Sequence, residues 1–77
     1  MTQPTPQQQD DFRAGRPLPG VAYAHDDLVT IGAGEQAGNV GSILALVDLC
    51  DDPVYRVEID SGFEVDVAQS NLTRADD

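Results

Sequence analysis

The stretch that decides the fold is Val54-Tyr55-Arg56-Val57-Glu58-Ile59-Asp60-Ser61-Gly62-Phe63-Glu64-Val65-Asp66-Val67. Apolar and polar residues alternate over 54–60 and again over 63–67, which is the period of a strand with one buried face. Ser61-Gly62 separates the two runs and is typical of a tight turn. The stretch therefore predicts a β-hairpin whose inward residues are Tyr55, Val57, Ile59, Val65 and Val67.

Further runs predict strands on both sides of this hairpin. We expect strands at about 28–32, 39–49, 54–60 and 63–68, with a short fifth strand near 70–73. Short strands with one apolar face must close on themselves to bury that face and to remove free edges. The sequence therefore predicts an all-β fold, a small SH3-like barrel of four to five strands. Its expected core is Leu28, Val29, Ile31, Val40, Ile43, Leu44, Leu46, Tyr55, Val57, Ile59, Val65, Val67 and Leu72.

The run from Val40 to Leu49 is apolar on both faces of an extended strand. Strict alternation places Val40, Leu44 and Leu46 on one face and Ile43, Ala45, Val47 and Leu49 on the other. A strongly bent central strand can bury both faces. Otherwise, part of one face is shared with a second copy, which predicts a homodimer through the Val40–Leu49 strand.

The first 20 residues differ in composition from the rest. They hold four of the five prolines and four of the six glutamines, and their two Asp and two Arg residues cancel. Such a segment buries too little apolar surface to offset the entropy lost on ordering. The sequence therefore predicts a disordered Pro/Gln-rich tail at 1–20 and a single barrel domain at 21–77.

Charge and length exclude several classes of protein. The 77 residues include 14 Asp and Glu against four Arg and no Lys, for a net charge of −10. So few cations argue against nucleic-acid binding, which neutralises phosphates. A core this small argues against an enzyme with a deep pocket. The longest apolar run, at 43–47, is far short of the roughly 20 residues that span a bilayer. With no signal-peptide pattern at the N-terminus, we expect a cytoplasmic, non-catalytic protein that needs no cofactor and contacts no membrane.

A glycine-rich stretch follows the first expected strand. Gly32-Ala33-Gly34-Glu35-Gln36-Ala37 has the outline of a dinucleotide-binding fingerprint, G-x-G-x-x-A. That motif requires a helix after the glycines, but Gly38 and Gly41 fall within its first turns. We therefore interpret the stretch as a loop between two strands, with glycines where φ is positive.

Three smaller groups have ordinary structural interpretations. His25-Asp26-Asp27 contains a His–carboxylate pair, but adjacent residues of an extended chain point to opposite faces, so we interpret it as a solvated strand entry. Asp48, Asp51 and Asp52 could bind a hard cation, yet Asp-Asp-Pro is also common turn chemistry, which we favour. Cys50 has no cationic neighbour in sequence to activate its thiol. We therefore expect no catalytic residue and no metal ligand.

The glycine loop and its neighbours also carry a family resemblance. Val29-x-Ile31, Gly34 and Gly38-x-Val40-x-x-Ile43 resemble the glycine-hinged strand pair of the KOW motif. They are similar too to small bacterial SH3-like proteins of unknown function and to the SH3-like barrel of nitrile hydratase β subunits. Those families continue with a run matched here by Tyr55-Arg56-Val57-Glu58, then a turn glycine (Gly62) and a polar-Leu step, Ser70-Asn71-Leu72.

This resemblance covers about residues 26–73 and implies a bacterial SH3-like barrel. KOW modules bind RNA or ribosomal partners through basic residues. The domain expected here has only Arg56 and Arg74, so RNA binding is not carried over.

Acidic residues are densest in and around the predicted hairpin. Within 16 residues, only Arg56 opposes six carboxylates: Asp51, Asp52, Glu58, Asp60, Glu64 and Asp66. Like charges on paired strands repel, so the sequence tolerates a cost to keep this face negative. Solubility is one explanation; a docking surface for a basic protein is the other.

The sequence thus predicts a non-catalytic acidic protein-interaction module that binds a basic partner through those six residues. Examples are an inhibitor or immunity protein, or an accessory subunit. The alternative is a small-ligand or metal-binding barrel, or an accessory domain of a metabolic enzyme.

Overall fold

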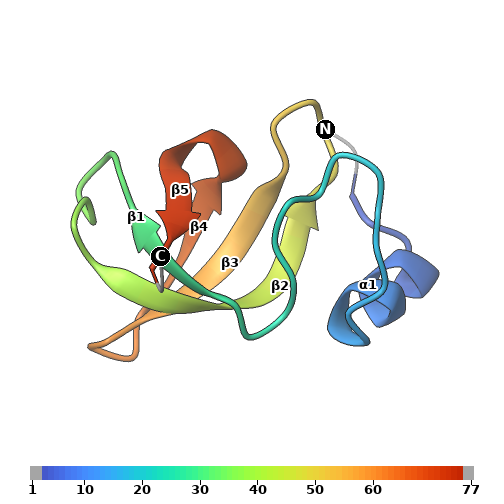
Figure 1. The fold of residues 1–77 in the computed structure, drawn as a ribbon, viewed down its shortest axis with the longest axis horizontal. Helices are drawn as coiled ribbons and strands as arrows, with labels where there is room; N and C mark the ends of the chain where they lie inside the picture. The colour runs from blue at the N-terminus through green and yellow to red at the C-terminus, as the bar shows by residue number, and fades with distance from the viewer. Residues whose placement is uncertain (1–2, 76–77) are drawn as a thin grey trace.

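The computed structural model describes residues 3–75, which form one short helix and one five-stranded antiparallel sheet (Figure 1). The elements are α1 (Pro6–Arg13), β1 (Leu28–Ile31), β2 (Val40–Asp48), β3 (Val54–Ile59), β4 (Glu64–Ala68), a 3-10 turn (Gln69–Asn71) and β5 (Leu72–Arg74). Each strand lies within two residues of its predicted position. The expectation of a small, mainly β fold is confirmed.

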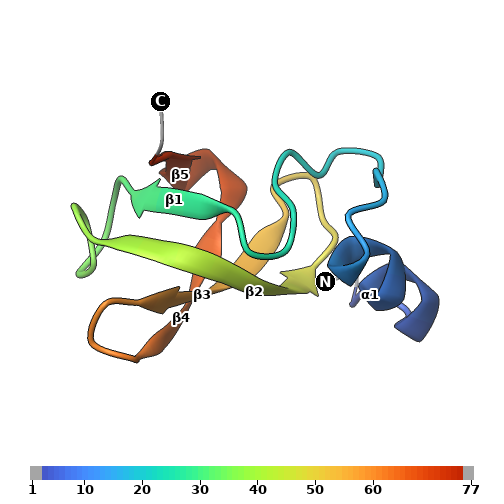
Figure 2. The ribbon, with the colours of Figure 1, turned by 60° about the horizontal axis from the view of Figure 1, so that its bottom comes forward.

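The sheet has the strand order β4-β3-β2-β1-β5. It curls strongly, so that β1 and β5 lie across the core from β3 and β4 (Figures 1 and 2). Within residues 3–75, β4 pairs only with β3 and β5 only with β1. The sheet is therefore not closed, and the expectation that closure removes both edges is not met. The reason is that β4 runs directly into the 3-10 turn, which redirects the chain to β1 and leaves the outer edge of β4 unpaired.

The β3–β4 hairpin has the predicted register. Val57 pairs with Val65 and Tyr55 with Val67, and the inward residues of β3 are buried. The turn is one residue longer than the sequence suggested. The Ile59 N–H donates to the Phe63 carbonyl and the Gly62 N–H to the Ile59 carbonyl, so residues 60–62 form the loop. Gly62 has φ +87°, the left-handed conformation that this three-residue loop requires.

Strand β2 departs from strict alternation. Its buried residues are Gly41, Ile43, Leu46 and Asp48, with a step of three in the middle. The register with β3 shifts between Ile43 and Ala45 and between Leu46 and Asp48, which marks β-bulges. The predicted division of Val40–Leu49 into two alternating faces is therefore wrong, because each extra residue exchanges the faces beyond it.

The N-terminal segment also differs from its predicted disorder. Thr5 caps α1 in a capping box with Gln8, and Pro6 occupies the first turn. Phe12, only 2% exposed, lies in the core with its ring centroid 6.1 Å from that of Tyr55. One aromatic anchor thus joins residues 3–20 to the domain, so the boundary predicted at residue 20 does not separate two parts. The predicted tail's first two residues lie outside the described range.

The core lies inside the curl of the sheet. It consists of Phe12, Val29, Ile31, Ile43, Leu46, Tyr55, Val57, Ile59, Val67 and Leu72. Of the predicted core, Leu44 and Val65 are only half-buried, and Leu28 and Val40 are exposed. The exposure of Leu28 and Val40 is important for the site, because it places apolar side chains on the outer face of the sheet.

Candidate functional site

Four residues form a straight row across the outer face of the sheet. Leu28 of β1 pairs with Ser42 of β2, Ser42 with Glu58 of β3, and Glu58 with Glu64 of β4. Directly paired residues of antiparallel strands share a face. The row therefore runs from an apolar side chain to two directly opposed carboxylates.

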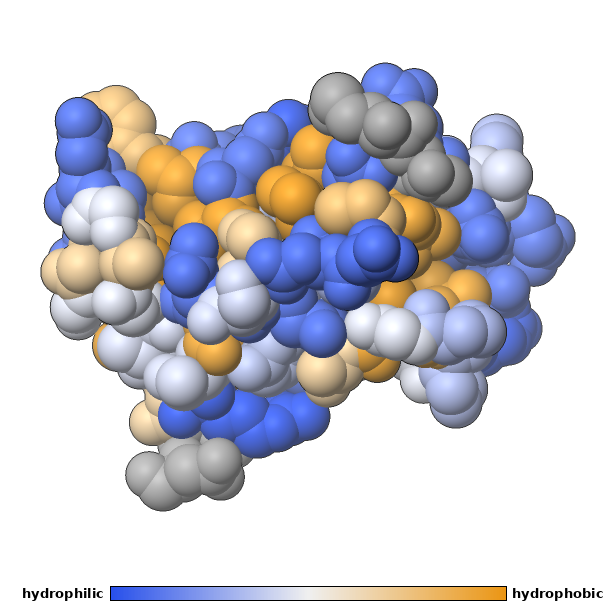
Figure 3. Space-filling view, turned by 90° about the horizontal axis from the view of Figure 1, so that it is seen from above, coloured by the Kyte–Doolittle hydropathy of each residue, from blue (hydrophilic) through white to orange (hydrophobic). Residues whose placement is uncertain are grey.

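A hollow of about 350 Å³ lies beside this row. Leu28 and Val40 contribute exposed apolar side chains, with 53% and 36% of their surface accessible, and Glu58 and Asp60 contribute carboxylates. The remaining lining is Gly41, Ser42, Ile59 and Gly62. We call this feature the outer hollow, and we call Glu58, Asp60 and Glu64 the acidic patch. Seen from above, the surface of the molecule shows hydrophobic areas between hydrophilic ones (Figure 3).

The structure divides the six acidic residues that the sequence grouped. Glu58, Asp60 and Glu64 gather around the hairpin turn, whereas Asp51 and Asp52 lie before the start of β3, at its opposite end. Asp52 accepts hydrogen bonds from the Ser70 N–H at 2.9 Å and the Ser70 hydroxyl at 2.6 Å, which anchors the 3-10 turn.

Asp66 is partly neutralised by its neighbour across the hairpin. Arg56 Nε lies 3.1 Å from Asp66 Oδ1, and hydrogen bonding to this carboxylate raises the pKa of Arg56. Glu64 also attracts the Arg56 guanidinium, but among residues 3–75 no carboxylate of the acidic patch forms an ion pair with a cationic side chain.

Sequence reasoning missed the apolar half of this surface. The sequence predicts Leu28 and Val40 in the core, and it does not single out Phe63, which is 69% exposed. A usable signal was present for Leu28. Val29 and Ile31 alternate with Thr30, so a two-residue period places Leu28 on the outer face.

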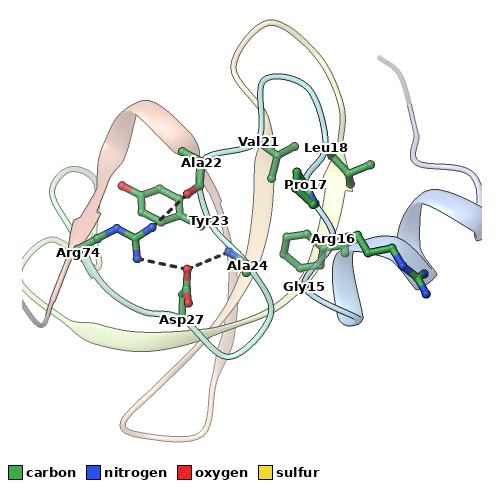
Figure 4. A pocket seen from close by; sticks show the side chains of 11 residues that line it. Gly15, Arg16, Pro17, Leu18, Val21, Ala22, Tyr23, Ala24, Asp27 and Arg74 are labelled. Carbon is green, nitrogen blue, oxygen red and sulfur yellow. Dashed lines mark hydrogen bonds and ion pairs between the residues drawn. The ribbon is translucent and has the colours of Figure 1, made fainter.

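A second hollow, of about 180 Å³, lies under the segment between α1 and β1 (Figure 4). Arg74 lies over the Tyr23 ring at 5.4 Å and donates to Asp27 at 3.4 Å and to the Ala22 carbonyl at 3.3 Å. Asp27 also accepts from the Ala24 N–H at 2.9 Å. These polar groups satisfy one another, so their evident role is to hold the segment against β5.

Gln69 ties the same segment to the core from the other side. Its Oε1 accepts hydrogen bonds from the Ala22 N–H and the Tyr55 hydroxyl, and its Nε2 donates to the Gly20 carbonyl. Burial raises the pKa of the Tyr55 hydroxyl. Tyr55 therefore serves the packing of the N-terminal segment.

The other candidate residues contact their neighbours in sequence. His25 Nδ1 is 3.3 Å from Asp26 Oδ2, and Asp26 itself has φ +70°. Asp48 is buried in β2, whereas Asp51 is exposed. Cys50 is exposed and donates to the Asp52 carbonyl at 3.1 Å. Among residues 3–75, no three His, Cys, Asp or Glu side chains converge in a metal-binding arrangement.

The glycine stretch is a loop, as interpreted from the sequence. It joins the antiparallel strands β1 and β2, with Gly34 at φ +86° and Gly38 at φ +90°. No helix of the described chain is long and apolar enough to cross a membrane.

Comparisons with known proteins give no relative from which a role could be transferred. No family model, no curated protein and no solved structure matches the chain.

Proposed function

We propose that this protein is a non-catalytic interaction module that binds a basic protein through the outer hollow and the acidic patch. The observation that carries the proposal is the row Leu28–Ser42–Glu58–Glu64, with apolar surface at one end and directly opposed carboxylates at the other. An Arg or Lys side chain placed between Glu58 and Glu64 relieves their repulsion. An apolar side chain beside it fits against Leu28 and Val40.

The area that a stable interface needs and the net charge of this protein indicate which kind of partner fits. A stable interface buries about 1,000 Å² or more, so the partner also covers neighbouring surface such as Phe63. A net charge of −10 attracts a basic protein from a distance and speeds its association. An inhibitor or immunity protein for a basic enzyme or toxin, or an accessory subunit, fits these properties.

We further propose that the sheet is a variant of the SH3-like barrel, in a bacterial, cytoplasmic protein. Support comes from the resemblance over residues 26–73 and from the five short antiparallel strands that curl around one core. The bulged β2 and the 3-10 turn before β5 give the sheet that curl.

Recovery of the partner is the first step of the test. A pull-down from the native lysate is followed by association rates at low and high salt. The double variant Glu58→Gln/Glu64→Gln associates more slowly at low salt, and high salt removes the difference. The control Asp10→Asn/Asp51→Asn loses the same charge away from the acidic patch and associates nearly as fast as the parent. Equal rates for the parent and the first variant at low salt would show that the acidic patch serves solubility only.

The homodimer through Val40–Leu49 stays a prediction. Both edges of β2 are paired, so a second copy can meet this strand only through side chains such as Val40. Analytical ultracentrifugation at micromolar concentration tests it, and a monomer mass would remove it.

A further inference from the structure

The edge strand β4 presents backbone groups that no strand pairs. In an antiparallel ladder, hydrogen-bonded pairs alternate with pairs that are not hydrogen-bonded. Backbone hydrogen bonds join Ile59 to Phe63 at one end of the β3–β4 ladder and Gln69 to Pro53 at the other. The hydrogen-bonded pairs between them are therefore Val57–Val65 and Tyr55–Val67. The N–H and C=O groups of Glu64, Asp66 and Ala68 therefore point away from β3. Within residues 3–75, no strand or loop pairs with this edge.

A groove of about 240 Å³ runs beside this edge. One wall is β4 from Val65 to Ala68, and the other is formed by Ile31, Asn71 and the loop residues 33–36. This space can admit side chains of an added strand beside β4. It lies at the seam where the curled sheet fails to close.

We propose that β4 accepts an extended segment of a basic protein as a sixth strand in this groove. Strand addition to an exposed sheet edge is a general mode of peptide recognition, in which main-chain hydrogen bonds supply affinity and side-chain pockets supply specificity. This inference goes beyond the proposed function because it uses the sheet edge, whereas the outer hollow lies on the sheet face.

The walls of the groove define the sequence of the segment. Inward side chains of an added strand continue the row of Val65 and Val67 toward Ile31, so they are apolar. Outward side chains lie next to Glu64 and Asp66, with Glu35 on the opposite rim, so they are basic. The segment therefore alternates small apolar residues with Arg or Lys.

A second copy of the chain is a poor occupant. Two antiparallel β4 strands would place Glu64 and Asp66 of one copy against the same residues of the other. Like charges on neighbouring strands are destabilising, and Arg56 already pairs with Asp66. Charge complementarity thus favours a basic strand from another protein.

Amide hydrogen exchange tests the free edge directly. In the protein alone, the amides of Glu64, Asp66 and Ala68 exchange at least tenfold faster than those of Val65 and Val67. A synthetic peptide Arg-Val-Arg-Val-Arg slows exchange at these three amides, and its acidic counterpart Glu-Val-Glu-Val-Glu does not. If the three amides are already protected in the protein alone, or become so with rising protein concentration, the inference is wrong.

The substitution Ala68→Pro tests the free edge of β4 by removing one backbone N–H. Ala68 has φ −71°, which proline adopts, and its N–H is not bonded to β3. Ala68→Pro removes one edge donor and weakens peptide binding about tenfold, in line with a lost hydrogen bond plus a steric block. The control Ala68→Ser keeps the N–H and the affinity.

Chemical-shift mapping separates the two surfaces: perturbation confined to Leu28, Ser42 and Glu58 would overturn strand addition and leave the outer hollow as the binding site. If Ala68→Pro fails to fold, the exchange and mapping experiments on the parent decide.

Discussion

At the scale of single residues, Gly41 allows β2 and β3 to approach closely. A Cβ added there would lie 2.5 Å from the Glu58 carbonyl oxygen and 2.7 Å from Val57 Cγ1, so β2 and β3 approach too closely for any side chain. Gly41→Ala should lower the free energy of unfolding by about 1–3 kcal/mol, the usual cost of overpacking, in a urea titration. Gly32→Ala is the control, because its Cβ would meet only the Asn71 carbonyl at 3.4 Å. Equal stabilities of the two variants would contradict the close approach.

Tyr55 gives the fold a dependence on alkaline pH. Burial raises the pKa of its hydroxyl in the folded state above the ordinary value of 10.0. The unfolded chain therefore loses this proton first as pH rises, and the resulting stability is complete below about pH 10 and lost as pH passes through the folded-state pKa. Urea titrations at successive pH values should show this loss in the parent. In Tyr55→Phe it should be smaller, although the variant starts from a lower stability because the bond to Gln69 is gone.

At the scale of elements, the β-hairpin was predictable and the helix was missed. The register of β3 and β4 follows from two alternating runs around Gly62 and is confirmed. Helix α1 was overlooked because proline and glutamine dominate its composition. The sequence nevertheless carries a signal for the start of the helix, because Thr5-Pro6-Gln7-Gln8 is a capping box with proline in the first turn. The docking of Phe12 was not predictable, because nothing local distinguishes an anchor from an exposed aromatic residue.

Strand β2 shows a different limit of prediction from sequence. Alternation in an apolar run cannot reveal bulges, since every register buries some apolar side chain. The bulges arise from pairing with β3, a tertiary interaction. As a result, Ile43 and Leu46 share the inward face.

The docking of α1 predicts that Phe12 is needed for the stability of the domain. Phe12→Ala removes a core ring and should cost about 3–5 kcal/mol, a large part of the stability of a small domain. Phe63→Ala is the matched control, because that ring is mostly exposed and its loss should change the thermal midpoint little. A midpoint for Phe12→Ala within a few degrees of the parent would show that α1 is not needed for stability.

At the scale of the whole molecule, some of the acidic residues have a compensating partner and others face a second carboxylate. Composition predicted a negative surface around 51–66, but it could not show which carboxylates are compensated. That division follows from pairings: Asp66 with Arg56, Asp52 with Ser70, and Glu58 opposite Glu64. On β4, Asp66 thus forms an ion pair with Arg56, whereas Glu64 lies directly opposite another carboxylate.

This difference on β4 predicts how stability responds to salt. Glu64→Gln removes a cross-strand repulsion and should raise the free energy of unfolding by about 0.2–1 kcal/mol at low salt. Asp66→Asn removes the partner of Arg56 and should not stabilise, although both variants change the net charge equally. Raising NaCl from about 20 mM to about 0.5 M screens the net charge of −10, so the thermal midpoint of the parent should rise. The thermal midpoints of the two variants should come closer together over the same range. Equal stabilisation of both variants at low salt would show that total charge, not the pairing on the hairpin, sets the electrostatic contribution to stability.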